Sequence, residues 1–357
     1  MHRREFLQSA ALGLAQLRVP AAWRTFEVTT RVEVLKPAGP TRVWVPAALA
    51  ADTPYQRTLD NLFNAGEGRA RIARSQADAL AVVVADYRAG VTPQLVVTSR
   101  VATRTHAVDV SSPGPSTRLG AGRGSRVDAG ELAHFLRPTK LLPTDGIVRL
   151  TAANITRGAK TDLQKARAIY DWVVEHTFRD AKVQGCGVGD IRFMLESKNL
   201  GGKCADLNAL YVGLARAAGI PARDVYGIRV AKSDLGYSSL GASSPNVTRA
   251  QHCRAEVHLD GYGWVPVDPA DVRKVALEEP PGNRPMTDAV VRTARERLFG
   301  AWEMNWMAFN FAHDVALPGS TGAAIPFLMY PQAETAAGRI DSLDPDRFRY
   351  EITAREI

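Results

Sequence analysis

Residues 201–223 read GGKCADLNALYVGLARAAGIPAR and carry the clearest helical pattern of the chain. Apolar side chains recur every three or four residues from Leu207 onward, which is the period of a helix with a buried face. Gly219 and then Pro221 are typical of a helix terminus. Cys204 stands at the start, where the partial positive charge and free N–H groups of a helix favour a thiolate. The run therefore predicts a helix that presents a nucleophilic cysteine at its N-terminus.

The two glycines before this helix are part of the same hypothesis. We expect Gly201 and Gly202 to let the backbone turn tightly and to leave space for a substrate carbonyl. The alternative is that Cys204 is a buried structural thiol, which is the commoner role of a lone cysteine. A histidine and a carboxylate in suitable places downstream would favour catalysis, because they complete a Cys-His-Asp triad.

A predicted β-hairpin supplies both partners. Its strands cover residues 255–259 and 264–267, and the turn between them is Asp260-Gly261-Tyr262-Gly263. Side chains alternate between the two faces of an extended chain, so one face of residues 252–259 carries His252, Arg254, Glu256 and His258. If the loop has an odd number of residues, Asp268 lies opposite Arg254 and diagonally within ~7–8 Å of His252. A loop of two or four residues places Asp268 on the other face, and register alone does not choose between His252 and His258.

Three stretches in this order resemble the transglutaminase-like superfamily. They are residues 201–223, the segment HCRAEV at 252–257 and the segment GYGWVPVDP at 261–269. The resemblance covers roughly residues 155–275 and implies an α+β, papain-related core, in which the helix carrying Cys packs on an antiparallel sheet. It also implies that Cys204 is the nucleophile, that His252 is the base, that Asp268 orients the histidine and that Trp264 packs beneath the hairpin. Arg254 stands where the family usually has tryptophan.

The first residues resemble a twin-arginine export signal. Arg3 and Arg4 are followed by x-Phe-Leu, a short apolar stretch and small residues near Pro20-Ala21-Ala22, where a signal peptidase could cut. The alternative is a short amphipathic helix. Export predicts a periplasmic or secreted protein in an oxidising compartment.

The remaining pattern divides the chain into segments. We expect a signal at 1–22, an N-terminal β-sandwich-like domain at 23–112, a linker at 113–128, a catalytic domain at 129–279 and a C-terminal extension at 280–357. Period-two alternation near residues 26–34 and short apolar runs near 43–45, 80–85 and 95–101 predict the strands of the first domain. A capped helix is predicted after Thr161, a further helix over 290–311, and strands at 327–330 and 348–352.

Composition excludes several classes of protein. Lys plus Arg is 45 and Asp plus Glu is 37, so the net charge is +8, and the surplus is spread along the chain. No basic stripe or known module indicates nucleic-acid binding. No apolar run approaches the ~18 residues that cross a bilayer, so we expect no membrane insertion. A peptide or protein substrate is the expected partner, and no cofactor or metal is expected.

The three cysteines leave two questions open. Cys186 and Cys253 could form a disulfide, or both could be idle thiols. A zinc site from these two with Cys204 and His252 has suitable ligand types but no Cys-x-x-Cys spacing, and Cys253 should point away from His252.

The expected function is acyl transfer through a thioester on Cys204. Water would release the acyl group in a peptidase or amidase, and an amine would release it in a transamidase. The backbone N–H of Cys204 is expected to contribute to the oxyanion hole. The loop at 232–249, rich in Ser and Gly, is expected to border the substrate groove. A binding module that keeps the fold without catalysis is the alternative.

Overall fold

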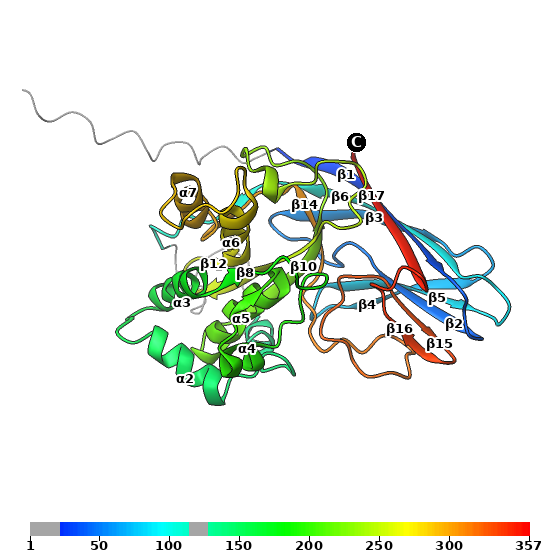
Figure 1. The fold of residues 1–357 in the computed structure, drawn as a ribbon, viewed down its shortest axis with the longest axis horizontal. Helices are drawn as coiled ribbons and strands as arrows, with labels where there is room; N and C mark the ends of the chain where they lie inside the picture. The colour runs from blue at the N-terminus through cyan, green and yellow to red at the C-terminus, as the bar shows by residue number, and fades with distance from the viewer. Residues whose placement is uncertain (1–21, 114–127) are drawn as a thin grey trace, which may run out of the picture.

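The computed structural model describes residues 22–113 and 128–357. The expected export signal lies outside the described residues except for Ala22, and the expected linker lies outside them except for its first and last residues. The architecture is mixed α+β, as the sequence predicts. Figure 1 shows a strand-rich half beside a half in which helices cover a small sheet.

Two antiparallel sheets build the strand-rich half. One sheet has the order β17-β1-β6-β3, in strands Phe348–Glu356, Arg24–Val34, Gln94–Thr103 and Gln56–Asn64. The other has the order β16-β15-β2-β5-β4, in strands Gly338–Ile340, Gln332–Thr335, Thr41–Pro46, Leu80–Tyr87 and Arg69–Ser75. Along β1, every second side chain from Phe26 to Val34 is buried, which confirms the predicted period of two.

Helices pack on a third antiparallel sheet in the other half. Its order is β12-β11-β10-β14, in strands Gly263–Val267, Gln251–Leu259, Ala222–Arg229 and Trp306–Asn310. The helices are α1 (Ala129–His134), α2 (Gly146–Ile155), α3 (Asp162–His176), α4 (Ile191–Ser197), α5 (Cys204–Ala217), α6 (Pro269–Glu278) and α7 (Ala289–Arg297). Short elements complete this half: β7 (His106–Ala107), β8 (Phe178–Arg179), β9 (Gly201–Gly202), η1 (Ser238–Leu240) and β13 (Ala301–Trp302).

The helix that carries Cys204 is the central helix of this half. Every residue of α5 except the last is buried, between α2 and α3 on one side and β11 on the other. Gly219 follows with φ +83°, in the left-handed region that favours glycine, so the predicted helix terminus is confirmed. Thr161 caps α3 by accepting a hydrogen bond from the Gln164 N–H, as its sequence predicts.

The C-terminal residues contradict two of the predicted elements. The helix expected over 290–311 is wrong beyond Arg297, because β13 and β14 follow it. Trp302, Trp306 and Phe309 have helical spacing, but β14 is buried throughout and pairs with β10, and this tertiary pairing overrides the local pattern. Residues 327–330 form no strand, whereas the predicted strand at 348–352 is β17.

The last eighty residues are therefore not an appendage. β17 pairs with β1, β15 pairs with β2, and β14 extends the sheet that holds His252. Residues 23–112 alone do not complete the sandwich, because strands from the C-terminal segment lie in both of its sheets. Among the described residues, the helices are all too short or too polar to cross a membrane.

Candidate active site

Cys204 is the first residue of α5, and the backbone before it is tightly packed. Gly201 and Gly202 form β9, which runs parallel to β8. A Cβ on Gly202 would lie 2.5 Å from Cβ of Asp206, and one on Gly201 would lie 2.3 Å from the Phe178 ring. The expectation that these glycines leave space for a substrate is thus wrong, because side chains of the protein occupy that space.

Asp206 fixes the start of α5 to the neighbouring loop. Its carboxylate accepts hydrogen bonds at 2.9 Å from the backbone N–H groups of Lys203, Val188 and Gly189. The Ala205 N–H donates to the carbonyl of Cys186 at 2.9 Å. Free amides at the helix N-terminus thereby tie the loop that carries Cys186 against Cys204.

His252 and Asp268 meet through the register of the hairpin. Leu259 pairs with Gly263, so the loop between them has three residues, and Ala255 pairs with Val267. This is the odd-numbered loop that brings Asp268 to the side of His252. His252 Nε2 donates to Asp268 Oδ2 at 2.8 Å, and both side chains are buried.

His258 lies elsewhere on the same strand. It is 1 % exposed, and its ring lies nearly perpendicular to that of Trp264, with 5.4 Å between the ring centroids. Trp264 packs against the hairpin as the resemblance implies. The structure therefore distinguishes the two histidines that register alone did not.

Asp268 is itself held in place. It caps α6, with Pro269 as the first helical residue, and its Oδ1 accepts hydrogen bonds from the Asp271 N–H at 3.0 Å and from Asn208 Nδ2 at 3.2 Å. Asn208 lies one turn after Cys204 on α5 and also donates to the carbonyl of Cys253 at 2.8 Å. One amide thus connects the helix of the cysteine, the strand of the histidine and the carboxylate.

Sequence reasoning missed a second buried carboxylate beside the histidine. Asp271 Oδ1 lies 3.4 Å from His252 Nε2 and accepts a hydrogen bond from Arg229 Nη2 at 2.6 Å. The available signal was its position three residues after Asp268, on the same side of the first turn of α6. Arg229 ends β10 and could be paired with Asp271 only through the tertiary fold.

Arg254 replaces the expected tryptophan without leaving a gap. Its guanidinium lies 4.9 Å from the ring centroid of Trp306 and donates to the Glu303 carbonyl at 2.8 Å. Trp306, on β14, donates its indole N–H to the His252 carbonyl at 2.9 Å. An aromatic side chain therefore supports the histidine, but it comes from the C-terminal segment.

The thiol of Cys204 is surrounded by polar partners. Cys186 and Cys253 belong to the same buried cluster as Cys204, and His252 is a further neighbour. The polar neighbours Cys186, then Cys253, and then His252 hold the pKa of Cys204 well below its usual range, although burial opposes this. None of the three cysteines forms a disulfide, so the pairing that the sequence left open is not present.

The imidazole has the opposite shift. Burial and the positive charge of Arg229 lower the pKa of His252, but the charges of Asp271 and Asp268 outweigh them and raise it to about 9. With the thiol pKa low and the imidazole pKa high, a thiolate–imidazolium pair is the favoured state near neutral pH.

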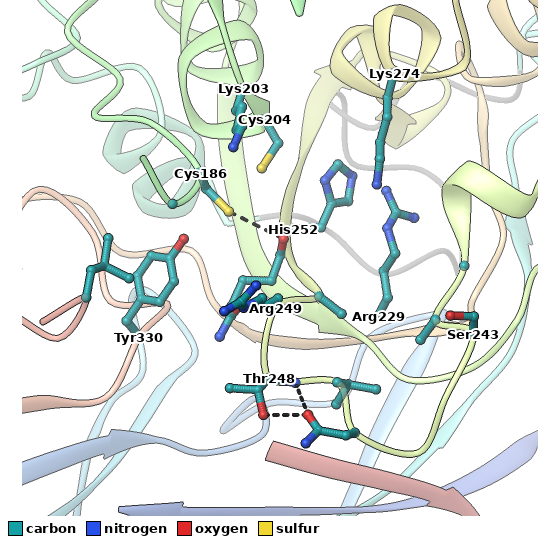
Figure 2. A pocket seen from close by; sticks show the side chains of 18 of the residues that line it. Cys186, Lys203, Cys204, Arg229, Ser243, Thr248, Arg249, His252, Lys274 and Tyr330 are labelled. Atoms are coloured by element: carbon teal, nitrogen blue, oxygen red, sulfur yellow. Dashed lines mark hydrogen bonds between the residues drawn. The ribbon is translucent and has the colours of Figure 1, made fainter. Parts of the chain in front are cut away.

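A cavity of about 530 Å³ opens at this pair (Figure 2). Cys186, Cys204 and His252 line it, together with Tyr330 and the loop from Gly241 to Ala250. The loop expected at 232–249 thus borders the cavity with its second half. Figure 2 shows the sulfur atoms and the imidazole converging on this space from different elements.

Comparisons with known proteins identify the domain around this cavity. The family model of the transglutaminase-like superfamily matches residues 149–269. The chain carries a transglutaminase-like domain. This stretch includes Cys204, His252 and Asp268, and it agrees with the resemblance seen in the sequence.

Two further similarities extend beyond the transglutaminase-like domain. An uncharacterized protein of Haemophilus influenzae is 40% identical over 236 residues, which are 64% of this chain and 63% of that protein. A crystal structure from Cytophaga hutchinsonii named "Putative Cysteine Protease" matches 95% of this chain and 92% of its own, with a TM-score of 0.54 and 14% identity. At this identity, the second similarity shows the fold alone.

Side chains that could bind a metal ion gather at one place in the described part of the transglutaminase-like domain. Within the described residues, the one set of three or more His, Cys or carboxylate side chains with ligand atoms within 4.8 Å of one another is His252, Asp268 and Asp271. The three cysteines and His252 do not gather as a four-ligand set. Arg229 already donates to the Asp271 oxygen that faces His252, so a guanidinium supplies the positive charge there.

Proposed function

We propose that the transglutaminase-like domain catalyses acyl transfer through a thioester on Cys204, with His252 and Asp268 as its partners. The observation that supports this most is the pairing of a low-pKa thiol with the buried His252–Asp268 hydrogen bond at an open cavity. The alternative, a binding module that keeps the fold, has no need of an activated thiol.

The proposed reaction begins with attack of the Cys204 thiolate on a carbonyl carbon. Because His252 Nε2 is engaged by Asp268, Nδ1 is the nitrogen that exchanges protons with the reacting groups. The imidazolium gives its proton to the leaving amine, and the acyl group stays on sulfur. The backbone N–H of Cys204 stabilises the oxyanion, since the neighbouring Ala205 N–H is already occupied by the Cys186 carbonyl.

We propose hydrolysis as the second step. His252 then takes a proton from water, the hydroxide attacks the thioester, and the carboxylic acid product leaves Cys204 as a thiolate. An amine in place of water gives transamidation. Peptide or amide hydrolysis agrees with the name of the Cytophaga hutchinsonii protein, which shares the fold.

Selective alkylation tests the activated thiol. At pH 6, iodoacetamide should modify Cys204 much faster than a thiol of pKa ~8.5, as located by peptide mass mapping. Cys186 and Cys253 serve as internal references, because the pKa of each lies well above its usual range. The neighbouring Cys204 and then burial raise the pKa of Cys186, and burial and then Cys204 raise that of Cys253. In urea-unfolded protein the three thiols should be alkylated at similar rates. If Cys204 of the native protein is alkylated no faster than in the unfolded protein, the proposal is excluded.

The reaction products distinguish hydrolysis of the thioester from transamidation. With a peptide library in ¹⁸O-labelled water, hydrolysis places the label in a new carboxyl group, and an added primary amine diverts the acyl group only in a transamidase. The Cys204→Ala variant should give neither product. Product formation by that variant would show that another group carries the chemistry.

We also propose that the protein acts outside the cytoplasm. The support is the twin-arginine pattern at Arg3 and Arg4. Replacement of both arginines by lysine should retain the protein in the cytoplasmic fraction, and an unchanged distribution would contradict export by this route.

A further inference from the structure

Positive charge dominates the walls of the cavity beside Cys204. Its lining includes five cationic side chains and no Asp or Glu, the cations being Arg179, Lys203, Arg229, Arg249 and Lys274. They come from β8, the residue before α5, the end of β10, the loop after η1 and α6. Figure 2 shows Lys203, Arg229, Arg249 and Lys274 around one space with Cys204 and His252.

Nearby carboxylates neutralise only part of this charge. Asp271 pairs with Arg229, and Glu278 is shared by Arg179 and Lys274, the latter at 3.7 Å. Within the described residues, neither Lys203 nor Arg249 lies within 4.0 Å of a carboxylate oxygen. Five cations thus face two carboxylates, and both carboxylates lie outside the lining.

The environment of Lys274 agrees with an uncompensated charge. Burial, and after it the positive charge of Arg229, lower the pKa of Lys274, in spite of Asp271 and Glu278. An anion in the cavity would relieve this repulsion. A neutral or basic ligand would not, and a basic one would add to it.

We propose that the substrate is an acidic peptide, with carboxylate side chains next to the carbonyl that Cys204 attacks. This inference rests on the proposed function and names its substrate class. Lys203 immediately precedes the nucleophile, so it suits a carboxylate on the residue beside the reacting carbonyl. Arg249 offers the planar pair of N–H donors that binds a carboxylate through two hydrogen bonds.

A second role for these cations needs to be separated from binding. Positive charge also stabilises a thiolate, so the same residues could act on Cys204 without contacting a substrate. The two roles can be separated, because they predict different effects on Cys204 reactivity and on peptide selectivity. An effect on the thiolate changes the reactivity of Cys204 with any reagent, whereas a subsite distinguishes acidic from neutral peptides.

The test is binding to the Cys204→Ala variant, which holds a peptide without turnover. The probes are capped Ala-Glu-Gln-Glu-Ala and its counterparts with Gln or Lys in place of both Glu residues. We expect the acidic peptide to bind at least about tenfold more tightly than the Gln peptide in calorimetry at low salt. The difference should shrink as added salt screens the charges.

Charge-removing variants locate the subsite. Lys203→Gln and Arg249→Gln, each in the Cys204→Ala background, should weaken binding of the acidic peptide and leave the Gln peptide unchanged. Arg192→Gln is the matched control, since Arg192 is an exposed arginine on α4 outside the cavity lining. Equal binding of all three peptides, or a preference that survives the Lys203→Gln, Arg249→Gln double variant, would overturn the inference.

The outcomes are separate from those of the proposed function. If Cys204 of the unmodified protein is alkylated rapidly but acidic peptides have no advantage, acyl transfer stands and the substrate class is wrong. If acidic peptides bind selectively but Cys204 is inert, the cavity is an acidic-peptide site without catalysis. Displacement of the acidic peptide by inorganic phosphate at constant ionic strength would reassign the site to phosphate groups and overturn the inference for carboxylates.

Discussion

At His252, two carboxylates approach one imidazole nitrogen. Asp268 is the closer and makes the hydrogen bond, at 2.8 Å against 3.4 Å for Asp271. Burial raises the pKa of Asp268, and the charge of Asp271 raises it further. The pKa of Asp271 is well below its usual range in spite of burial, because Arg229 and His252 stabilise its charge. Asp268 therefore holds the imidazole through a hydrogen bond, while the surroundings of Asp271 favour its charged form.

This division predicts the alkaline limb of the pH profile. His252 has a raised pKa of about 9, so the imidazolium that protonates the leaving group is present below that pH and lost above it. Asp271→Asn removes a charge that raises this pKa. The alkaline limb of kcat/KM should then move to lower pH by about one unit or more.

A double variant controls for the buried arginine. Asp271→Asn leaves Arg229 without its partner, whereas Arg229→Gln with Asp271→Asn removes both charges. Since Arg229 itself lowers the pKa of His252, the double variant should return the limb toward that of the unmodified protein. An alkaline limb that stays in place in the single variant would show that Asp271 does not set the His252 pKa.

The position of Cys204 could be predicted from a local rule, whereas the choice of His252 and Asp268 rested on the family resemblance, because register and loop parity left alternatives open. Cys204 begins a strongly periodic helix, and Asp268 reaches the face of His252 through the parity of a three-residue loop. Asp271 and Arg229 could not be paired in this way. Their contact joins α6 to the end of β10, forty-two residues apart, and depends on tertiary packing.

At the scale of elements, the N-terminus of α5 is assembled from β9 and the loop before α4. Asp206 accepts hydrogen bonds from two backbone N–H groups of that loop and from the N–H of Lys203, which follows β9, and the glycine at 202 lets its carboxylate approach. The position of Cys204 therefore depends on backbone packing as well as on its side-chain neighbours.

Gly202→Ala should disturb this assembly. The added Cβ would lie 2.5 Å from Cβ of Asp206, so the loop or the helix must shift. We expect the free energy of unfolding in urea to fall by about 1–3 kcal/mol, together with slower alkylation of Cys204 at pH 6.

Gly130→Ala is the matched control, because Gly130 is exposed on helix α1 and a Cβ there meets only the end of the Asp128 side chain. It should leave both measurements unchanged or raise stability slightly. If Gly202→Ala behaves in the same way, close packing at the start of α5 is not required for its reactivity.

At the scale of the whole molecule, one apolar cluster joins the sandwich to the transglutaminase-like half. Phe26 and Val28 from β1 and Ile352 from β17 belong to the same buried cluster as Cys186 and Cys204. The loop beside the cavity is also bonded to β17, since the Val247 N–H donates to the Ile352 carbonyl at 2.8 Å. Sequence patterns identified several strands of each half, such as β1, β5 and β17, but not this union, because it joins residues more than a hundred positions apart.

Ile352→Ala should therefore destabilise both halves together. Loss of a buried isoleucine costs about 2–5 kcal/mol, and the two halves should unfold in one transition. The unfolding midpoints measured by far-UV circular dichroism and by labelling of the buried Cys253 thiol should shift to the same lower urea concentration. A two-step loss of dichroism, with thiol labelling at its original midpoint, would show that the halves unfold independently.

The pairing of β1 with β17 also sets the order of events during synthesis. Val34 ends the first strand and Phe348 begins its partner, so about three hundred residues separate them. At ~5–20 residues per second, a ribosome needs on the order of tens of seconds to supply the missing strand. During that interval one edge of β1 has no partner from its own chain, and the active-site core lacks Ile352. The packing of Ile352 in the cluster of Cys204 can therefore be completed only after the last strand has been translated.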